Sequence, residues 1–295
     1  MAPSDTLAET ARRLCASSVR AYRQPYEAID WPESLERPQW FTSPELVSLY
    51  ATPAWAALTD HERRELSFWE AVNFYSLNLH GEKALTEGLA RRLHQPGLEE
   101  VSDYLHHFLD EENKHSIWFT TFCRRYAGKI YPDRTVSFAR EMAPGEDDVL
   151  FFARVAIFEE LVDRYNRAMG RDPRLAPVAR QINARHHADE SRHLAFGRHA
   201  VEHLWARHRS GWSEETVEGM RRQLAGYLLS TWRAYYSAAA YRDAGLTEAH
   251  ALARSTWGHP ATIEHRRLVS AQALGWLGEL GVLDVGAVDL GASCR

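Results

Sequence analysis

Cysteine is scarce in this sequence. Its 295 residues include three cysteines, Cys15, Cys123 and Cys294, which are odd in number and far apart. This spacing excludes a disulfide framework and a cysteine-rich zinc site, and it is typical of proteins in a reducing compartment. We therefore expect a cytoplasmic protein in which the three thiols have no chemical role.

Long apolar runs and basic clusters are also missing. No segment approaches the roughly 20 apolar residues that cross a bilayer, and the first residues, MAPSDTLAETARRL, lack the apolar core of a secretory signal. The net charge is -5 and the basic residues are scattered, whereas a nucleic-acid-binding surface needs a basic stripe. The sequence therefore predicts neither a membrane nor a nucleic-acid partner.

Strand patterns, in which apolar and polar residues alternate between turn pairs, are absent as well. Apolar residues instead recur at helical spacing, which predicts an all-α protein. Thr59 and Glu62 form a T-x-x-E capping box that predicts a helix start. Four long helices are expected at about 60–93, 98–127, 147–169 and 173–208, with Gly128 and Gly170 ending the second and third. Helices this long are typical of a bundle.

The flanks of this region have a different composition. Residues 1–58 predict a short helix at 1–20 and a proline-rich segment that wraps the surface. Residues 59–210 form the bundle, and residues 211–295 predict helices at about 213–242, 247–257 and 261–280 that pack on it, within one domain. Trp232, Tyr235 and Tyr236 in the fifth helix favour core packing, with a substrate-lining role as the alternative.

Two E-x-x-H motifs carry the candidate chemistry. Glu112 and His115 lie in the second helix, and Glu190 and His193 lie in the fourth, where His186 shares their face at i, i+4, i+7 spacing. The first motif lies in the middle of an apolar stripe made of Leu105, Phe108, Phe119 and Phe122. Burying an unpaired carboxylate costs several kcal/mol, so buried glutamates and histidines in this pattern indicate a metal.

The helix before each motif carries a further glutamate. Glu82 lies 30 residues before Glu112, and Glu159 lies 31 residues before Glu190, so the two halves repeat the same unit. A glutamate from each of two helices and Glu-x-x-His from the other two form a site for two metal ions in helical bundles.

The neighbours of these two glutamates leave alternatives. Glu160 projects toward Arg164 and Arg167, on a face expected to be solvated, so Glu159 is the better ligand and Glu160 the alternative. Glu82 shares its helix with Glu70 and Glu87, and only its spacing matches the second half.

The four-helix pattern resembles the ferritin-like di-iron oxygenases, and His186 resembles the additional histidine ligand of the AurF-like N-oxygenases. The resemblance implies a ferritin-like four-helix bundle core with additional N- and C-terminal helices. It also implies a metal-ligand set of four carboxylates and three histidines: Glu82, Glu112, His115, Glu159, His186, Glu190 and His193. His187 is the alternative to His186. In related folds the acid before E-x-x-H supports the histidine of the opposite motif, which implies such a role for Asp189 toward His115 and for Glu111 toward His193.

The oxygen and nitrogen ligands favour two iron ions, with manganese compatible, and dioxygen as co-substrate. The sequence has no G-x-G-x-x-G nucleotide site, so electrons are expected from a separate reductase, a ferredoxin or a chemical donor. The chain is expected to act as a monomer or a homodimer.

The resemblance implies a monooxygenase that oxidises a small (aryl)amine to a hydroxylamine, nitroso or nitro product in secondary metabolism, such as antibiotic biosynthesis. Two alternatives remain: a di-iron enzyme that hydroxylates carbon, and a ferritin-like protein that handles metal or peroxide without an organic substrate.

Overall fold

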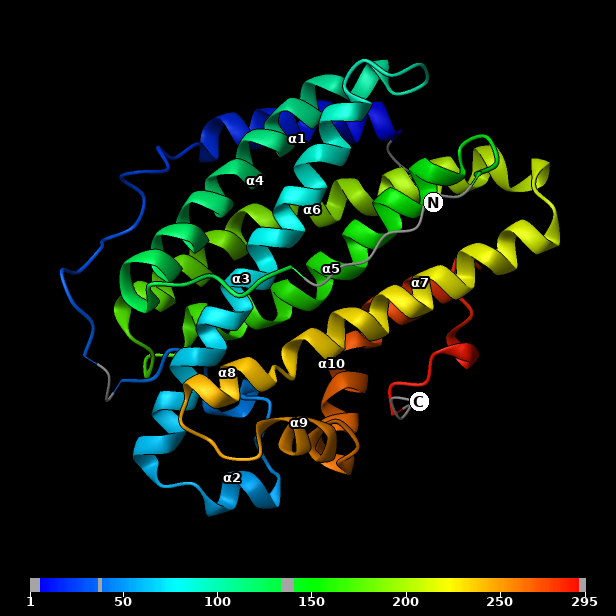
Figure 1. Ribbon diagram of the computed structural model, residues 1–295. Coiled ribbons are helices and arrows are strands. Elements are labelled where there is room, and N and C mark those ends of the chain that lie inside the picture. The colour runs from blue at the N-terminus through cyan, green and yellow to red at the C-terminus, as the bar shows by residue number, and fades with distance from the viewer. Residues whose placement is uncertain (1–5, 37–38, 134–140, 292–295) are drawn as a thin grey trace.

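Helices account for most of the chain, and four of them form a bundle. The computed structural model describes residues 6–36, 39–133 and 141–291, so Cys294 lies outside the described residues. The bundle helices are α3 (Asp60–Arg92), α4 (Ser102–Phe122), α5 (Glu146–Arg171) and α6 (Pro177–His208). α3 packs along α4 and α5 along α6, and further contacts join α3 to α5 and α4 to α6 (Figure 1).

The all-α prediction is confirmed. Within the described residues there is no β-strand, and the extended segments form only an isolated bridge between Trp40 and Leu175. None of the helices in those ranges combines the length and the apolar composition needed to span a bilayer.

The start of α3 and the end of the α4 region follow local sequence signals. The side chain of Thr59 accepts from the backbone N–H of Glu62, and the Glu62 carboxylate accepts from the backbone N–H of Thr59, so the predicted capping box is present. The predicted helix 98–127 is divided into a 3-10 turn (Glu99–Val101), α4 and a π-helical turn (Cys123–Ala127). It ends at Gly128, whose φ of 68° lies in the left-handed region that glycine tolerates.

The predicted end of the third helix at Gly170 is wrong, because α5 continues to Arg171. Gly170 serves close packing instead. A Cβ at this position would lie 2.8 Å from the Cα of Ala184 on α6, so the two backbones can approach only without a side chain here.

The flanking helices cover the bundle. α1 (Leu7–Ala21) packs on α4 and α6, while α7 (Glu214–Tyr235) and α10 (Pro260–Glu279) pack on α5. α8 (Ala238–Asp243) packs on α3 and on α9 (Ala249–Trp257), and the short α2 (Pro53–Ala57) lies at the same end of the molecule (Figure 1). The continuous helix predicted at 213–242 is wrong: the chain turns after Tyr235, and the Ser237 hydroxyl caps α8 by accepting from the N–H of Ala240.

Candidate metal centre

The seven candidate ligands converge in the interior of the bundle. Glu82 comes from α3, Glu112 and His115 from α4, Glu159 from α5, and His186, Glu190 and His193 from α6. Each side chain belongs to a residue that is at most 3% exposed. Water therefore cannot compensate the buried carboxylates, and the compensation has to come from within the cluster.

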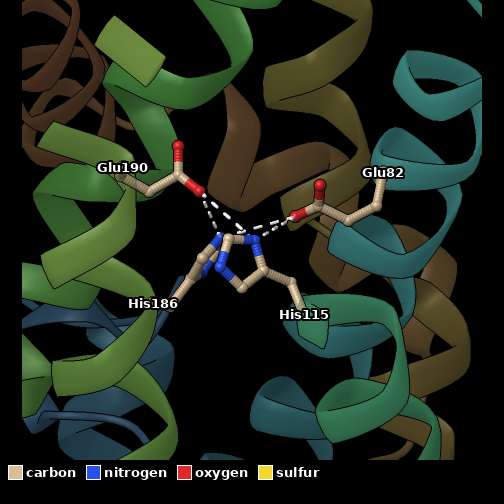
Figure 2. A group of neighbouring side chains, drawn as sticks. All are labelled: Glu82, His115, His186 and Glu190. Carbon is tan, nitrogen blue, oxygen red and sulfur yellow. Dashed lines mark ion pairs between the residues drawn. The ribbon is translucent and has the colours of Figure 1, made fainter. Parts of the chain in front are cut away.

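The seven side chains form two adjoining groups. Glu82, His115, His186 and Glu190 make the first group, and Glu112, Glu159 and His193 make the second. Within each group, one candidate ligand atom per residue lies within 4.8 Å of all the others. Figure 2 shows the carboxylates of Glu82 and Glu190 reaching the two imidazole rings of the first group from opposite sides.

The two carboxylates of the E-x-x-H motifs lie between the groups. Glu112 approaches His193 Nδ1 at 2.7 Å and His115 Nδ1 at 3.5 Å. Glu190 lies 2.7 Å from His186 Nε2 and 3.5 Å from His193 Nδ1. Each carboxylate thus faces histidines of both groups, which is the position that a carboxylate shared by two metal ions takes.

Each histidine turns one nitrogen toward the carboxylates and the other toward a supporting partner. The inward atoms are Nδ1 of His115 and His193 and Nε2 of His186, and none of the three has a hydrogen-bond partner among the described residues. Both carboxylate oxygens of Glu112 and of Glu159 are buried and unpartnered in the same way. Such orphaned buried atoms are rare in folded proteins unless a ligand or an ion satisfies them.

The outward nitrogens of the two motif histidines contact the supporting acids that the sequence predicts. His115 Nε2 lies 3.2 Å from Asp189 Oδ2, and His193 Nε2 lies 2.8 Å from Glu111 Oε2. With Nε2–H donating to a carboxylate, Nδ1 keeps its lone pair directed inward. Arg192 bridges the two acids, at 2.6 Å from Glu111 and 2.5 Å from Asp189.

His186 has a neutral supporting partner. Its Nδ1 lies 2.7 Å from the side-chain amide of Asn166 on α5, which fixes the ring with Nε2 directed at Glu82 and Glu190. His187 points elsewhere: it is about a third exposed at its side chain and bonds Asp163 at 2.5 Å. The alternative position for the seventh ligand therefore lies outside the two groups.

The alternative glutamates also have partners outside the cluster. Glu70 accepts hydrogen bonds from Ser48, and the exposed Glu87 forms an ion pair with Arg91. The prediction that Glu160 lies on a solvated face is wrong. Glu160 is 4% exposed and pairs with Arg198 of α6, because α6 supplies a half-buried cation on that side of α5.

The charge of the cluster calls for cations. Desolvation and the neighbouring Glu190 raise the pKa of Glu159 well above its ordinary value. The contact with Asp189 and the nearby charges of Glu112 and Glu190 raise the pKa of His115 to about 9 against the opposing effect of burial. In the deprotonated state that metal binding requires, four carboxylates and three neutral imidazoles would carry four negative charges, which two divalent ions would neutralise. The donor set of oxygens and imidazole nitrogens suits iron or manganese.

Sequence reasoning missed Arg192 and Asn166. Arg192 follows Glu190 by two residues, and its position on the same helix turn is visible in the sequence, but its two acidic partners are not. Asn166 lies one turn beyond Val162 on the apolar side of α5. A buried side-chain amide needs a hydrogen-bond partner, so its position among apolar residues could have indicated a polar group nearby.

Comparison with known proteins gives a family and a fold. The family model described as p-aminobenzoate N-oxygenase AurF matches residues 4–281. Uncharacterized proteins of Mycobacterium tuberculosis and Mycobacterium bovis are 28% identical over 200 residues, and the match covers 64% of this chain and 58% of each relative. The chain thus spans less than two thirds of the length of these curated relatives.

The similar solved structures are R2-like ligand-binding oxidases. The enzyme from Sulfolobus acidocaldarius is 18% identical with a TM-score of 0.51, and the match covers 97% of this chain and 94% of that chain. A variant with an anaerobically reconstituted Mn/Fe cofactor is 17% identical with a TM-score of 0.51, over 89% and 93% of the two chains. At these identities the likeness establishes the ferritin-like fold alone.

Proposed function

Because this chain belongs to the AurF family, we propose that it is a di-iron oxygenase that adds oxygen to the nitrogen of a small aromatic amine. The observation that carries the proposal is the set of four glutamates and three histidines, divided between two groups whose inward atoms have no other partner. Glu82, His115 and His186 would hold one ion, Glu159 and His193 the other, and Glu112 and Glu190 would lie between them. When bound, the two irons supply the electrons and the binding site that dioxygen activation needs.

The overall reaction needs an external donor of two electrons. For the first oxidation step, R–NH2 + O2 + 2 H⁺ + 2 e⁻ gives R–NHOH + H2O, in which one oxygen atom enters the amine and the other becomes water. We propose a separate reductase or ferredoxin as the donor, because the sequence contains no nucleotide-binding motif. Further rounds lead to nitroso and nitro compounds, which fits a role in secondary metabolism.

The protein's own groups keep the centre dry and oriented. The ligands lie among buried aromatic side chains: Phe108 stacks on His193 with ring centroids 4.0 Å apart, and Phe119 packs edge-on against His186 at 5.0 Å. Asp189, Glu111 and Asn166 fix the three imidazoles from outside. This buried, preorganised arrangement suits oxidation of an organic substrate more than storage of free iron, and the family favours nitrogen over carbon as the atom oxidised.

Product analysis tests the proposal. Iron-loaded protein is reduced, mixed with ¹⁸O2 and an arylamine panel, and the products are separated by liquid chromatography and identified by mass. We expect hydroxylamine, nitroso or nitro products that carry ¹⁸O, and none with the metal-free protein. Ring-hydroxylated products alone would favour the carbon hydroxylase instead. Peroxide consumption without any organic product would favour the peroxide-handling alternative.

A further inference from the structure

A second feature of the molecule is an aromatic cavity beside the metal centre. It has a volume of about 240 Å³ and is lined from α3, α5, α10, the end of α7 and the segment 42–51. For comparison, an apolar cavity of about 150 Å³ can hold a benzene molecule. The space therefore suits one small aromatic compound.

Aromatic rings form the inner wall of the cavity. Phe74 and Tyr165 are stacked with their centroids 5.6 Å apart, and Tyr235 packs against both, at 6.1 Å from Phe74 and 5.1 Å from Tyr165. The electron-rich faces of aromatic rings favour contacts with other aromatic rings and with cations. Trp232, Tyr235 and Tyr236 are buried, as core packing predicts, and Tyr235 and Tyr236 also line the cavity.

Neighbouring residues link the cavity lining to the metal centre. Tyr165 lines the cavity, and the next residue, Asn166, bonds His186. Phe74 also lines the cavity, and the next residue, Tyr75, stacks on Phe119 with centroids 5.4 Å apart. Phe119 in turn contacts His186. The cavity is therefore linked to His186 by two short chains of contacts, one through Tyr165 and Asn166 and one through Phe74, Tyr75 and Phe119.

The charged groups at the cavity are acidic. Glu45, Glu70 and Glu264 line it, whereas no lysine or arginine does so in the part of the chain that the structure describes. Glu70 is 7% exposed and has no cationic partner there: the Ser48 N–H donates to it at 2.9 Å, and the Ser48 hydroxyl donates as well. Burial raises the pKa of Glu70 to about 8 against these two hydrogen bonds, so its carboxyl is mostly protonated near pH 7 and would ionise when a cation binds beside it.

The basic groups nearby are already engaged. Arg266 uses its guanidinium to donate to the carbonyls of Leu290 and Trp257 and to the hydroxyl of Tyr236. Arg174 pairs with Glu45, at 2.7 and 2.9 Å, and with Asp172. His265 lines the cavity, but burial and the neighbouring arginines lower its pKa to about 4, so it is neutral near pH 7.

We infer that this cavity binds the amine substrate of the function proposed above, and that it selects neutral or cationic aromatic amines over aminobenzoates. A benzoate would find no lysine or arginine on the cavity lining to pair with its charge. An ammonium group would contact the aromatic rings and the buried Glu70 side chain, whose carboxyl would ionise beside it. The inference distinguishes this chain's substrate class from the compound in the family's description.

Three para-substituted anilines of similar size test the inference. 4-Aminobenzoate is negative, 4-methylaniline is neutral, and 4-(aminomethyl)aniline is positive at pH 7. Their binding to the full-length, iron-loaded protein is measured by titration calorimetry under argon, so that no turnover occurs. We expect 4-(aminomethyl)aniline to bind at least about tenfold more tightly than 4-aminobenzoate, which corresponds to about 1.4 kcal/mol. The neutral compound should lie between them.

Two variants and a control locate the effect. Glu70→Gln keeps the shape and removes the group that ionises beside a bound cation, and should reduce the preference for the ammonium compound to less than about threefold. Leu268→Trp, at the exposed mouth of the cavity, should weaken all three ligands. Glu87→Gln makes the same carboxyl-to-amide change on the exposed surface of α3 and should leave the order unchanged.

Two results would overturn the inference: equal or tighter binding of 4-aminobenzoate by the unmodified protein, or an order that Glu70→Gln does not alter. Because binding is measured without dioxygen, it is independent of the oxidation chemistry. The expected binding order without any oxygenated product would refute the proposed function and leave the cavity's selectivity standing.

Discussion

Replacing Glu190 by alanine is expected to lower the affinity for at least one metal ion by more than about 100-fold, equivalent to about 2.7 kcal/mol, and to abolish oxygen chemistry. Glu190 faces His115 and His193 as well as His186, so its loss affects both groups of ligands. Helicity should persist, because the bundle is held by its apolar core. Metal titration and circular dichroism measure the two effects.

The pair Glu159 and Glu160 supplies the matched control for this experiment. Both are buried glutamates on α5, but Glu159 lies in the cluster and Glu160 pairs with Arg198. Glu159→Gln should weaken metal binding, whereas Glu160→Gln should lower thermal stability and leave the metal content unchanged. Full oxygen chemistry in Glu190→Ala, or metal loss confined to Glu160→Gln, would show that the ligands have been assigned wrongly.

Replacing His186 by alanine is expected to reduce N-oxygenation by more than about tenfold, at least about 1.4 kcal/mol of transition-state stabilisation. Six candidate ligands remain, so iron should still bind. The variant loses the inward Nε2 of His186, whose ring is held by the neutral side-chain amide of Asn166. His187→Ala is the control and should be nearly silent, because His187 contacts Asp163 outside the cluster.

Product yield and the absorption spectrum of the iron-loaded protein are compared for the two histidine variants. If His187→Ala is damaging and His186→Ala is silent, the seventh ligand has been misplaced. If neither variant changes yield or spectrum, His186 is not a ligand, and the two-metal centre rests on the other six residues.

The arrangement of the centre was accessible from sequence because its ligands lie on helices. Helical periodicity places Glu112 with His115, and Glu190 with His193, on one face. The repeated spacing to Glu82 and Glu159 then relates the four helices without knowledge of their packing. The resemblance to related di-iron folds, and not the periodicity, implied the supporting contacts of Asp189 and Glu111, which the structure contains.

Features that depend on packing between segments were not accessible. Gly170 has the sequence signature of a helix end, but its role is to let α5 and α6 approach. Glu160 has arginine neighbours on its own helix, yet its partner, Arg198, comes from α6. The aromatic cavity combines side chains from distant parts of the chain, and no local pattern places Glu70 beside Tyr235.

The claim that the bundle holds two metal ions is tested most directly by metal analysis. Protein produced in iron-rich medium is purified without chelators, and its metal content per chain is measured by inductively coupled plasma mass spectrometry. The four carboxylates and three imidazoles of the cluster predict two irons per chain. A reproducible value near one, or zinc in both positions, would contradict the di-iron centre.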